Sequence, residues 1–207
     1  RDPEMSRGLG DVYKRQALLR RLDFRNVLPA VFVVLCVGCY SVGILFDAPS
    51  RLGYGTSAPF YTLFTYSFFH VSFLHLALNM ALFLWFVKRL RPFSSDNRIF
   101  VFAFVGALLA AWISRGDRLV AGASGINYVL IGADYLFRFR SLYPQFRVWL
   151  TYTVSLAVSL LLGFLLPHLP GALHLVAFLC GVCWASAVVY NPFKKVMTWI
   201  RKMVRKK

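Results

Sequence analysis

The stretch His70-Val-Ser-Phe-Leu-His75-Leu-Ala-Leu-Asn79 places two histidines and an asparagine inside an otherwise apolar segment. A second apolar segment opens with Gly122-Ala-Ser124-Gly125, and a third carries His174 near its start. An unpaired polar group in hydrocarbon costs on the order of 2–7 kcal/mol, so polar residues inside membrane-spanning segments are candidates for a functional site. Together these residues supply a nucleophile, a base and hydrogen-bond donors, which are the components of a serine hydrolase.

The composition predicts a helical membrane protein. Hydrophobic residues form 58% of the 207-residue chain, and the mean hydropathy is +0.60. A helix needs roughly 20 predominantly apolar residues to cross a bilayer. Six segments approach that length: Val27–Phe46, Tyr66–Val87, Ile99–Ser114, Gly122–Phe139, Phe146–Leu166 and Gly171–Tyr190. We therefore predict an all-α membrane protein, with a bundle of six transmembrane helices in residues 27–190.

The lysines and arginines predict how the chain is oriented. The net charge is +16, yet the basic residues concentrate in alternate loops and at the two ends. With the N-terminus inside, the outer loops hold only Arg51, Arg115 and Arg118. Cytoplasmic loops of membrane proteins carry an excess of Lys and Arg, so both termini are predicted to be cytoplasmic. The charge therefore indicates membrane topology, and we expect no nucleic-acid partner.

The ends of the chain differ in character from the apolar core. Residues 1–16 do not start with Met and are polar and patternless, so we treat them as a non-native or disordered leader. Residues 17–26 form a basic cytoplasmic segment. Residues 191–207 combine apolar residues at helical spacing with Lys and Arg on the other face. That pattern is typical of an amphipathic helix on anionic lipid headgroups.

The predicted topology brings the polar residues to a similar depth. The second, fourth and sixth spans all run from outside to inside, and His75, Ser124 and His174 lie near the outer end of one span each. Asn79 lies about 40° around the helix from His75, so both side chains point the same way. His70 lies about 140° from His75, so it points elsewhere if the helix is regular there.

Small residues predict close packing between the fourth and sixth spans. Stripes of them run along both segments: Gly125 and Gly132 on the fourth, and Ala177, Gly181 and Ala185 on the sixth. Such stripes let helix backbones approach closely. The contact would carry His174 within reach of Ser124, with Tyr128 one turn below the serine and placed to pack against the imidazole.

Each candidate residue type suits one step of acyl transfer. A serine hydroxyl is a weak nucleophile until a base takes its proton, and histidine titrates in the range suited to that task. Attack on an amide carbonyl creates an oxyanion, which His75, Asn79 and the Ser124 amide could stabilise, with one donor worth about 3–4 kcal/mol. Asp134 lies deeper and is expected to pair with Arg138. We therefore predict a Ser/His dyad without a carboxylate, a metal or a cofactor.

Three motifs in order, His70-x4-His75-x3-Asn79, Gly122-x-Ser124-Gly125-x2-Tyr128-x3-Gly132 and Ala172-x-His174 with Gly181, resemble the rhomboid family of intramembrane serine proteases. The resemblance covers about Val27 to Tyr190 and implies a six-span core. It also implies hydrolysis of peptide bonds in or near the outer leaflet, in the transmembrane segments of other proteins.

The resemblance implies a role for each matching residue. Ser124 matches the nucleophile and His174 the general base, while His75 and Asn79 match the oxyanion donors. Further matches are supporting residues: Tyr128 stacked on the histidine, and Gly122 and Gly125 shaping the serine turn. The fifth span and the first loop, Asp47–Thr65, correspond to the family's gate region, where Tyr54, Phe60 and Tyr61 suit an interfacial position. For His70 the sequence leaves two interpretations open, a supporting residue of the site or a hydrogen-bonded packing residue.

The expected partners are transmembrane protein substrates and membrane lipids. A short chain of this kind suits a multi-pass protein of a bacterial cytoplasmic membrane. One alternative is a non-catalytic rhomboid-like protein that binds membrane proteins, although such relatives typically lack the serine or the histidine. A metal or haem carrier using His70, His75 and His174 would leave Ser124 unexplained. A transporter is less favoured because the two halves of the chain show no internal repeat.

Overall fold

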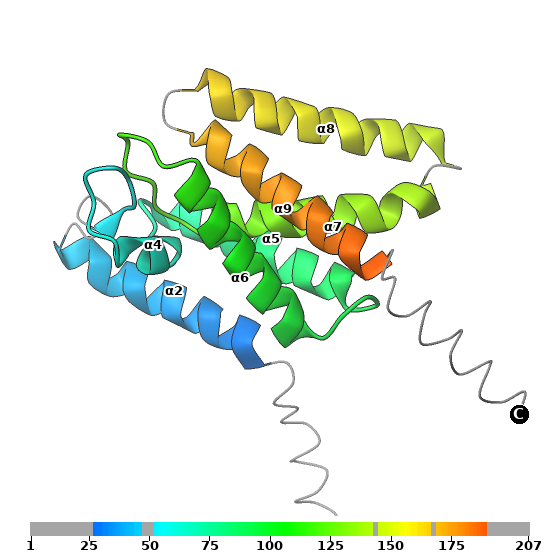
Figure 1. The fold of residues 1–207 in the computed structure, drawn as a ribbon. Helices are drawn as coiled ribbons and strands as arrows, with labels where there is room; N and C mark the ends of the chain where they lie inside the picture. The colour runs from blue at the N-terminus through cyan, green and yellow to red at the C-terminus, as the bar shows by residue number, and fades with distance from the viewer. Residues whose placement is uncertain (1–26, 47–51, 143–144, 167–168, 190–207) are drawn as a thin grey trace, which may run out of the picture.

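The computed structural model describes residues 27–46, 52–142, 145–166 and 169–189. The expected leader, the basic segment 17–26 and the amphipathic tail 191–207 lie outside these residues. The long helices are α2 (Val27–Phe46), α5 (Phe73–Leu90), α6 (Asp96–Ile113), α7 (Ser124–Leu142), α8 (Phe146–Leu165) and α9 (Gly171–Val189), as Figure 1 shows. Two short helices, α4 (Thr62–Thr65) and the 3-10 helix η2 (Tyr66–Phe68), lie between α2 and α5. The all-α prediction is confirmed for the described part of the chain.

Five helices are long and apolar enough to cross a membrane, namely α2, α5, α6, α8 and α9. The helix α7 is not in this set, because Asp134, Arg138 and Arg140 make its second half charged. Many large apolar side chains face outward, including Val34 and Leu45 of α2 and Leu165 of α8. In water such a surface would be unfavourable, whereas lipid accepts it. The chain is a multi-pass membrane protein.

The helix α7 lies at the centre of the bundle. It contacts α5, α6, α8 and α9, and its side chains Ile126 and Leu130 are fully buried in the main apolar core. By contrast, α2 and α8 lie on opposite sides of the bundle (Figure 1). Ser124 is the first residue of α7 and therefore lies at one end of this central helix.

The close approach expected between the fourth and sixth spans is confirmed for α7 and α9. A Cβ added to Gly132 would collide with the carbonyl oxygen of Phe178, and one added to Gly181 would collide with that of Val129. The two backbones are in direct contact at both places, which only glycine allows. This packing sets the distance between the residues that α7 and α9 carry.

The predicted second span, Tyr66–Val87, is wrong as a single helix. Residues 66–68 form η2, Phe69 has an extended backbone, and α5 begins only at Phe73 and continues to Leu90. Ser72 caps α5, because its Oγ accepts a hydrogen bond from the His75 backbone N–H at 3.2 Å. His70 consequently lies in a non-helical segment, and the rotation argument that directed it away from His75 does not apply.

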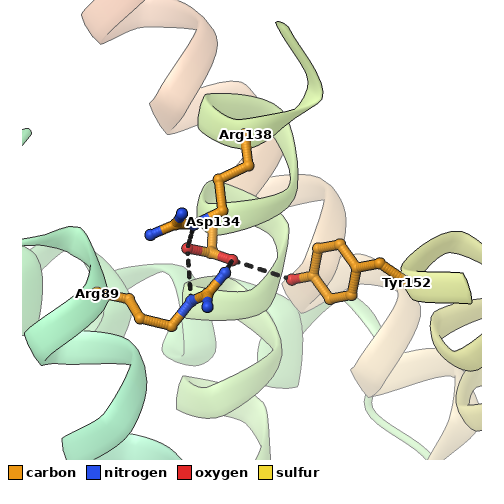
Figure 2. Close-up of polar contacts among 4 residues, drawn as sticks. All are labelled: Arg89, Asp134, Arg138 and Tyr152. Carbon is orange, nitrogen blue, oxygen red and sulfur yellow. Dashed lines mark hydrogen bonds and ion pairs between the residues drawn. The ribbon is translucent and has the colours of Figure 1, made fainter. Parts of the chain in front are cut away.

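A buried carboxylate near the middle of α7 connects three helices. The Asp134 side chain is fully buried and accepts hydrogen bonds from Arg89 Nε of α5 at 3.1 Å and from Arg138 Nε at 2.8 Å. The Tyr152 hydroxyl of α8 donates to it at 3.3 Å (Figure 2). The expected pair with Arg138 is present, and Arg89 and Tyr152 are two further partners of the same carboxylate. A buried charge requires such partners, so Asp134 stabilises this packing of α5, α7 and α8.

The first loop is fixed to the segment that leads into α7. Tyr54 and Val120 exchange backbone hydrogen bonds of 2.9 Å. The Arg115 guanidinium donates to the Gly55 carbonyl at 3.0 Å and lies over the Tyr54 ring. Tyr54 is buried beneath these contacts, whereas Phe60 and Tyr61 are exposed. The interfacial position of the three residues stays a prediction.

Candidate active site

Ser124 lies at the N-terminus of α7, directly after a turn that requires glycine. Gly122 has φ +115°, a conformation that residues with a Cβ rarely adopt. Its N–H donates to the Tyr66 carbonyl at 2.9 Å, which anchors the turn to η2. The first N–H groups of an α-helix have no intrahelical partner, and Ser124 lies beside them at the positive end of the helix dipole.

His174 of α9 is hydrogen-bonded to Ser124. The distance from His174 Nε2 to Ser124 Oγ is 3.0 Å. The imidazole is stacked on the Tyr128 ring, with centroids 4.2 Å apart and an interplanar angle of 17°. His174 Nδ1 is buried and has no hydrogen-bond partner among the described residues. The structure therefore brings together a serine, a histidine and a tyrosine, and no carboxylate of the described residues orients the histidine.

His70 is hydrogen-bonded to the backbone of the serine turn. Its Nε2 accepts a hydrogen bond from the Ala123 N–H at 3.3 Å, and its Nδ1 lies 3.3 Å from the Phe68 carbonyl oxygen. These partners assign the proton to Nδ1. Because both ring nitrogens are engaged by the backbone, His70 is suited to holding the turn and not to binding a metal ion. In the described part of the chain, no three His, Cys, Asp or Glu side chains gather as metal ligands.

His75 covers the turn at Gly122. A Cβ on Gly122 would lie only 2.6 Å from His75 Cε1 and 3.0 Å from Nε2, so the imidazole rests directly against the glycine. The rings of His70 and His75 are neighbours, with centroids 5.1 Å apart. This contact places the His75 imidazole beside the residue two before Ser124.

Asn79 lies one turn further along α5, beside the first turn of α7. Its Nδ2 donates to the His75 carbonyl at 2.8 Å, and its Oδ1 accepts a hydrogen bond from Asn127 Nδ2 at 2.9 Å. Asn79 and Asn127 are both buried. The predicted residues His75 and Asn79 thus both flank the serine turn, one at Gly122 and the other through Asn127.

Sequence reasoning missed two polar residues that touch the site. Asn127 bonds Asn79, and the Ser159 hydroxyl of α8 is hydrogen-bonded to the Tyr128 hydroxyl. Asn127 carries the same signal that singled out Asn79, a polar side chain in an apolar segment, and it could have been found that way. Ser159 could not, because a single serine in an apolar helix is common and its partner is on another helix.

The helix α8 closes the site on the side of His174. A Cβ on Gly163 would lie 3.6 Å from His174 Nδ1 and 3.1 Å from the Gly171 Cα. Gly125 is also closely packed, because a Cβ there would lie 3.0 Å from Leu173 and 3.2 Å from the Tyr66 hydroxyl. Glycine at both positions lets the neighbouring helices enclose the serine and the histidine.

The apolar helices define a multi-pass membrane protein. The paired serine and histidine give it a partly buried polar site at a helix N-terminus. The sequence pattern of the rhomboid domain matches residues 57–191 of the chain, which is more than half of it. The chain therefore belongs to the rhomboid family. No curated protein matches the chain.

Proposed function

We propose that this rhomboid-family protein is an intramembrane serine endopeptidase with a Ser124–His174 dyad. The observation that carries the proposal is the 3.0 Å contact between His174 Nε2 and Ser124 Oγ at the N-terminus of α7. A hydroxyl gains nucleophilicity when a positioned base can take its proton. A structural serine in a membrane helix usually bonds its own backbone instead, as Ser186 bonds the Val182 carbonyl.

The mechanism follows from these contacts. His174 Nε2 takes the proton of Ser124 Oγ as the oxygen attacks the substrate carbonyl carbon, forming a tetrahedral oxyanion. The imidazolium then gives this proton to the leaving amine, and the C–N bond breaks to leave an acyl-serine. Water attacks the acyl-serine with His174 again acting as base, which releases the acid and restores the serine. Stacking on Tyr128 holds the ring in place of a carboxylate.

The oxyanion would be stabilised by the donors that surround the serine turn. The N–H groups in the first turn of α7 point toward the space before the helix. His75 lies against Gly122, and the Asn79 carboxamide has one N–H left after bonding His75. One such preorganised donor is typically worth about 3–4 kcal/mol in the transition state.

The membrane arrangement is part of the proposal. We place α7 as a sixth span, because its charged residues are paired inside the protein through Asp134 and need not face lipid. With both termini cytoplasmic, Ser124 lies in the outer leaflet, near Arg115 and Arg118 of a loop with few basic residues. The expected substrates are transmembrane segments of other proteins, in a bacterial cytoplasmic membrane.

The test is cleavage of a single-pass membrane protein by the purified chain in liposomes. We expect Ser124→Ala and His174→Ala each to abolish cleavage while remaining folded, because each removes one member of the dyad. The matched control is Ser186→Ala, which removes a serine of α9 that bonds only its own helix and should leave the rate unchanged. Cleavage by Ser124→Ala would disprove the dyad. A folded wild-type protein that cleaves none of a panel of transmembrane segments would favour the non-catalytic alternative.

A further inference from the structure

The hydrogen bonds between Asn79 and Asn127 connect α5 to the first turn of α7. Asn127 Nδ2 lies 2.9 Å from Asn79 Oδ1 and 3.1 Å from the Asn79 carbonyl oxygen. The two residues are separated by 48 positions in the chain. Asn127 follows Ser124 by three residues, so both lie on neighbouring positions of one helix face. The amide of Asn127 therefore fixes Asn79 relative to the helix that carries the serine.

These bonds determine the orientation of the whole Asn79 carboxamide. A carboxamide is planar, with one carbonyl oxygen and two N–H donors on the nitrogen. In Asn79 the oxygen is held by Asn127, and one N–H is held by the His75 carbonyl at 2.8 Å. The direction of the second N–H is then fixed, and among the described residues it has no partner. Without Asn127 the group could rotate about its terminal torsion, which is broad for asparagine.

We infer that Asn127 is a positioning residue, which acts through Asn79 to aim its remaining N–H at the oxyanion. This inference rests on the proposed function, since it assigns a role within the same reaction. It concerns a residue that the family motifs quoted above leave unspecified, between Gly125 and Tyr128.

The surroundings of Asn127 show that stability alone does not favour an asparagine there. Asn127 is 2% exposed, and its own Oδ1 is buried without a hydrogen-bond partner in the described part of the chain. A buried polar atom without a partner costs about 1–3 kcal/mol. An apolar residue of the same size would avoid this cost, although it would leave Asn79 Oδ1 without its donor. The two effects oppose each other, so replacing Asn127 should change stability little and activity considerably.

The test is a double-mutant cycle between Asn127→Leu and Asn79→Ala, measured as kcat and KM in liposomes with a cleavable transmembrane substrate. We expect Asn127→Leu to lower kcat by roughly 10-fold, with KM within about 2-fold and the melting temperature within about 3 °C of wild type. In the Asn79→Ala background the same change should alter kcat by less than about 2-fold, because the group that it positions is gone. Asn127→Val, a second apolar replacement without a hydrogen-bond donor, should match Asn127→Leu.

The control is Ile126→Ala, a fully buried apolar neighbour on α7. Its effect on kcat should be the same factor in both backgrounds, as for a residue that acts by packing alone. The inference is overturned if Asn127→Leu and Asn127→Val leave kcat unchanged, or if the Asn127→Leu factor persists in the Asn79→Ala background. Loss of folding in Asn127→Leu together with full activity of Asn127→Val would overturn it as well. Absence of Ser124-dependent cleavage by the wild type is a different result, which removes the proposed function and this inference together.

Discussion

Gly122 is the residue whose replacement should most directly disturb the serine turn. It has φ +115°, and a Cβ there would lie 2.6 Å from the His75 ring. We expect Gly122→Ala to cost about 1–3 kcal/mol of stability through backbone strain and to lower the cleavage rate at least 10-fold by displacing His75. Thermal unfolding and a cleavage assay measure the two effects.

The control for Gly122→Ala is a glycine with room for a side chain. Gly38 of α2 has no atom within 4 Å of the site where a Cβ would lie. Alanine favours a helix more than glycine does by roughly 0.5–1 kcal/mol, so Gly38→Ala should be neutral or slightly stabilising. Equal activity of Gly122→Ala and wild type would show that the turn does not depend on this glycine.

Several features of the site could be predicted from single residues, and others could not. Polar residues in apolar segments led to Ser124, His174, His75 and Asn79, because burial without a partner is costly. The structure places Ser124, His174 and His75 together and connects Asn79 to α7 through Asn127. The role of His70 was not predictable, since it depends on the break before Phe73 that lets its ring meet the Ala123 amide. Partners that lie far apart in the chain, such as Asn127 for Asn79, carry no local signal of their pairing.

At the scale of helices, the contact between α7 and α9 sets the distance between the serine and the histidine. Because a Cβ on Gly181 would collide with the Val129 carbonyl oxygen, Gly181→Ala must push the two helices apart. We expect a loss of about 1–3 kcal/mol of stability from overpacking. The cleavage rate should also fall, since the 3.0 Å contact with Ser124 would lengthen. Activity and melting temperature equal to those of Gly38→Ala would contradict this account of the packing.

The Asp134 cluster should stabilise the packing of α5, α7 and α8 without taking part in the chemistry. Asp134→Asn removes the charge that pairs with Arg89 and Arg138, whose side chains are 27% and 30% exposed. This partial exposure lowers the expected loss to about 1.5–3 kcal/mol, the range of hydrogen bonds to charged groups. Unfolding in detergent measures it, with KM and kcat changing little at temperatures where the variant is folded.

An ion pair whose arginine faces solvent provides the comparison for Asp134. Arg91 pairs with Asp96 at 2.7 Å; the Asp96 side chain is 5% exposed, but that of Arg91 is 58% exposed. Solvent screens the charge of the exposed Arg91, whereas Asp134 is fully buried, so Arg91→Gln should cost less than Asp134→Asn. The reverse order would show that the buried cluster is not a stabilising contact.

Helix positions were more predictable than helix ends. The apolar length of Val27–Phe46 predicts α2 with the bounds that the structure gives. The start of α5 was wrong by several residues, because Ser72 caps the helix after an extended residue that apolar character alone does not reveal. The apolar pattern also treated α7 as a span like the others, although its charged second half depends on partners from α5 and α8.

For the whole molecule, the distribution of basic residues predicts that Ser124 faces the outer leaflet. Arg115 and Arg118 lie in the loop before α7, whereas Lys88 and Arg89 end α5 at the opposite side. Single cysteines introduced at Asp117 and at Ser94, in a chain whose native cysteines are replaced, should react differently with a membrane-impermeant thiol reagent in intact cells. We expect labelling at position 117 only. Labelling at position 94 alone would reverse the topology.

The central claim is that His174 activates Ser124, and a fluorophosphonate probe tests it most directly because it reacts covalently only with an activated serine. The purified, detergent-solubilised wild type should be labelled, and mass spectrometry should locate the adduct on Ser124. Labelling should disappear in both Ser124→Ala and His174→Ala and persist in Ser186→Ala. A folded wild type that is not labelled, or label that remains in Ser124→Ala, would contradict the account.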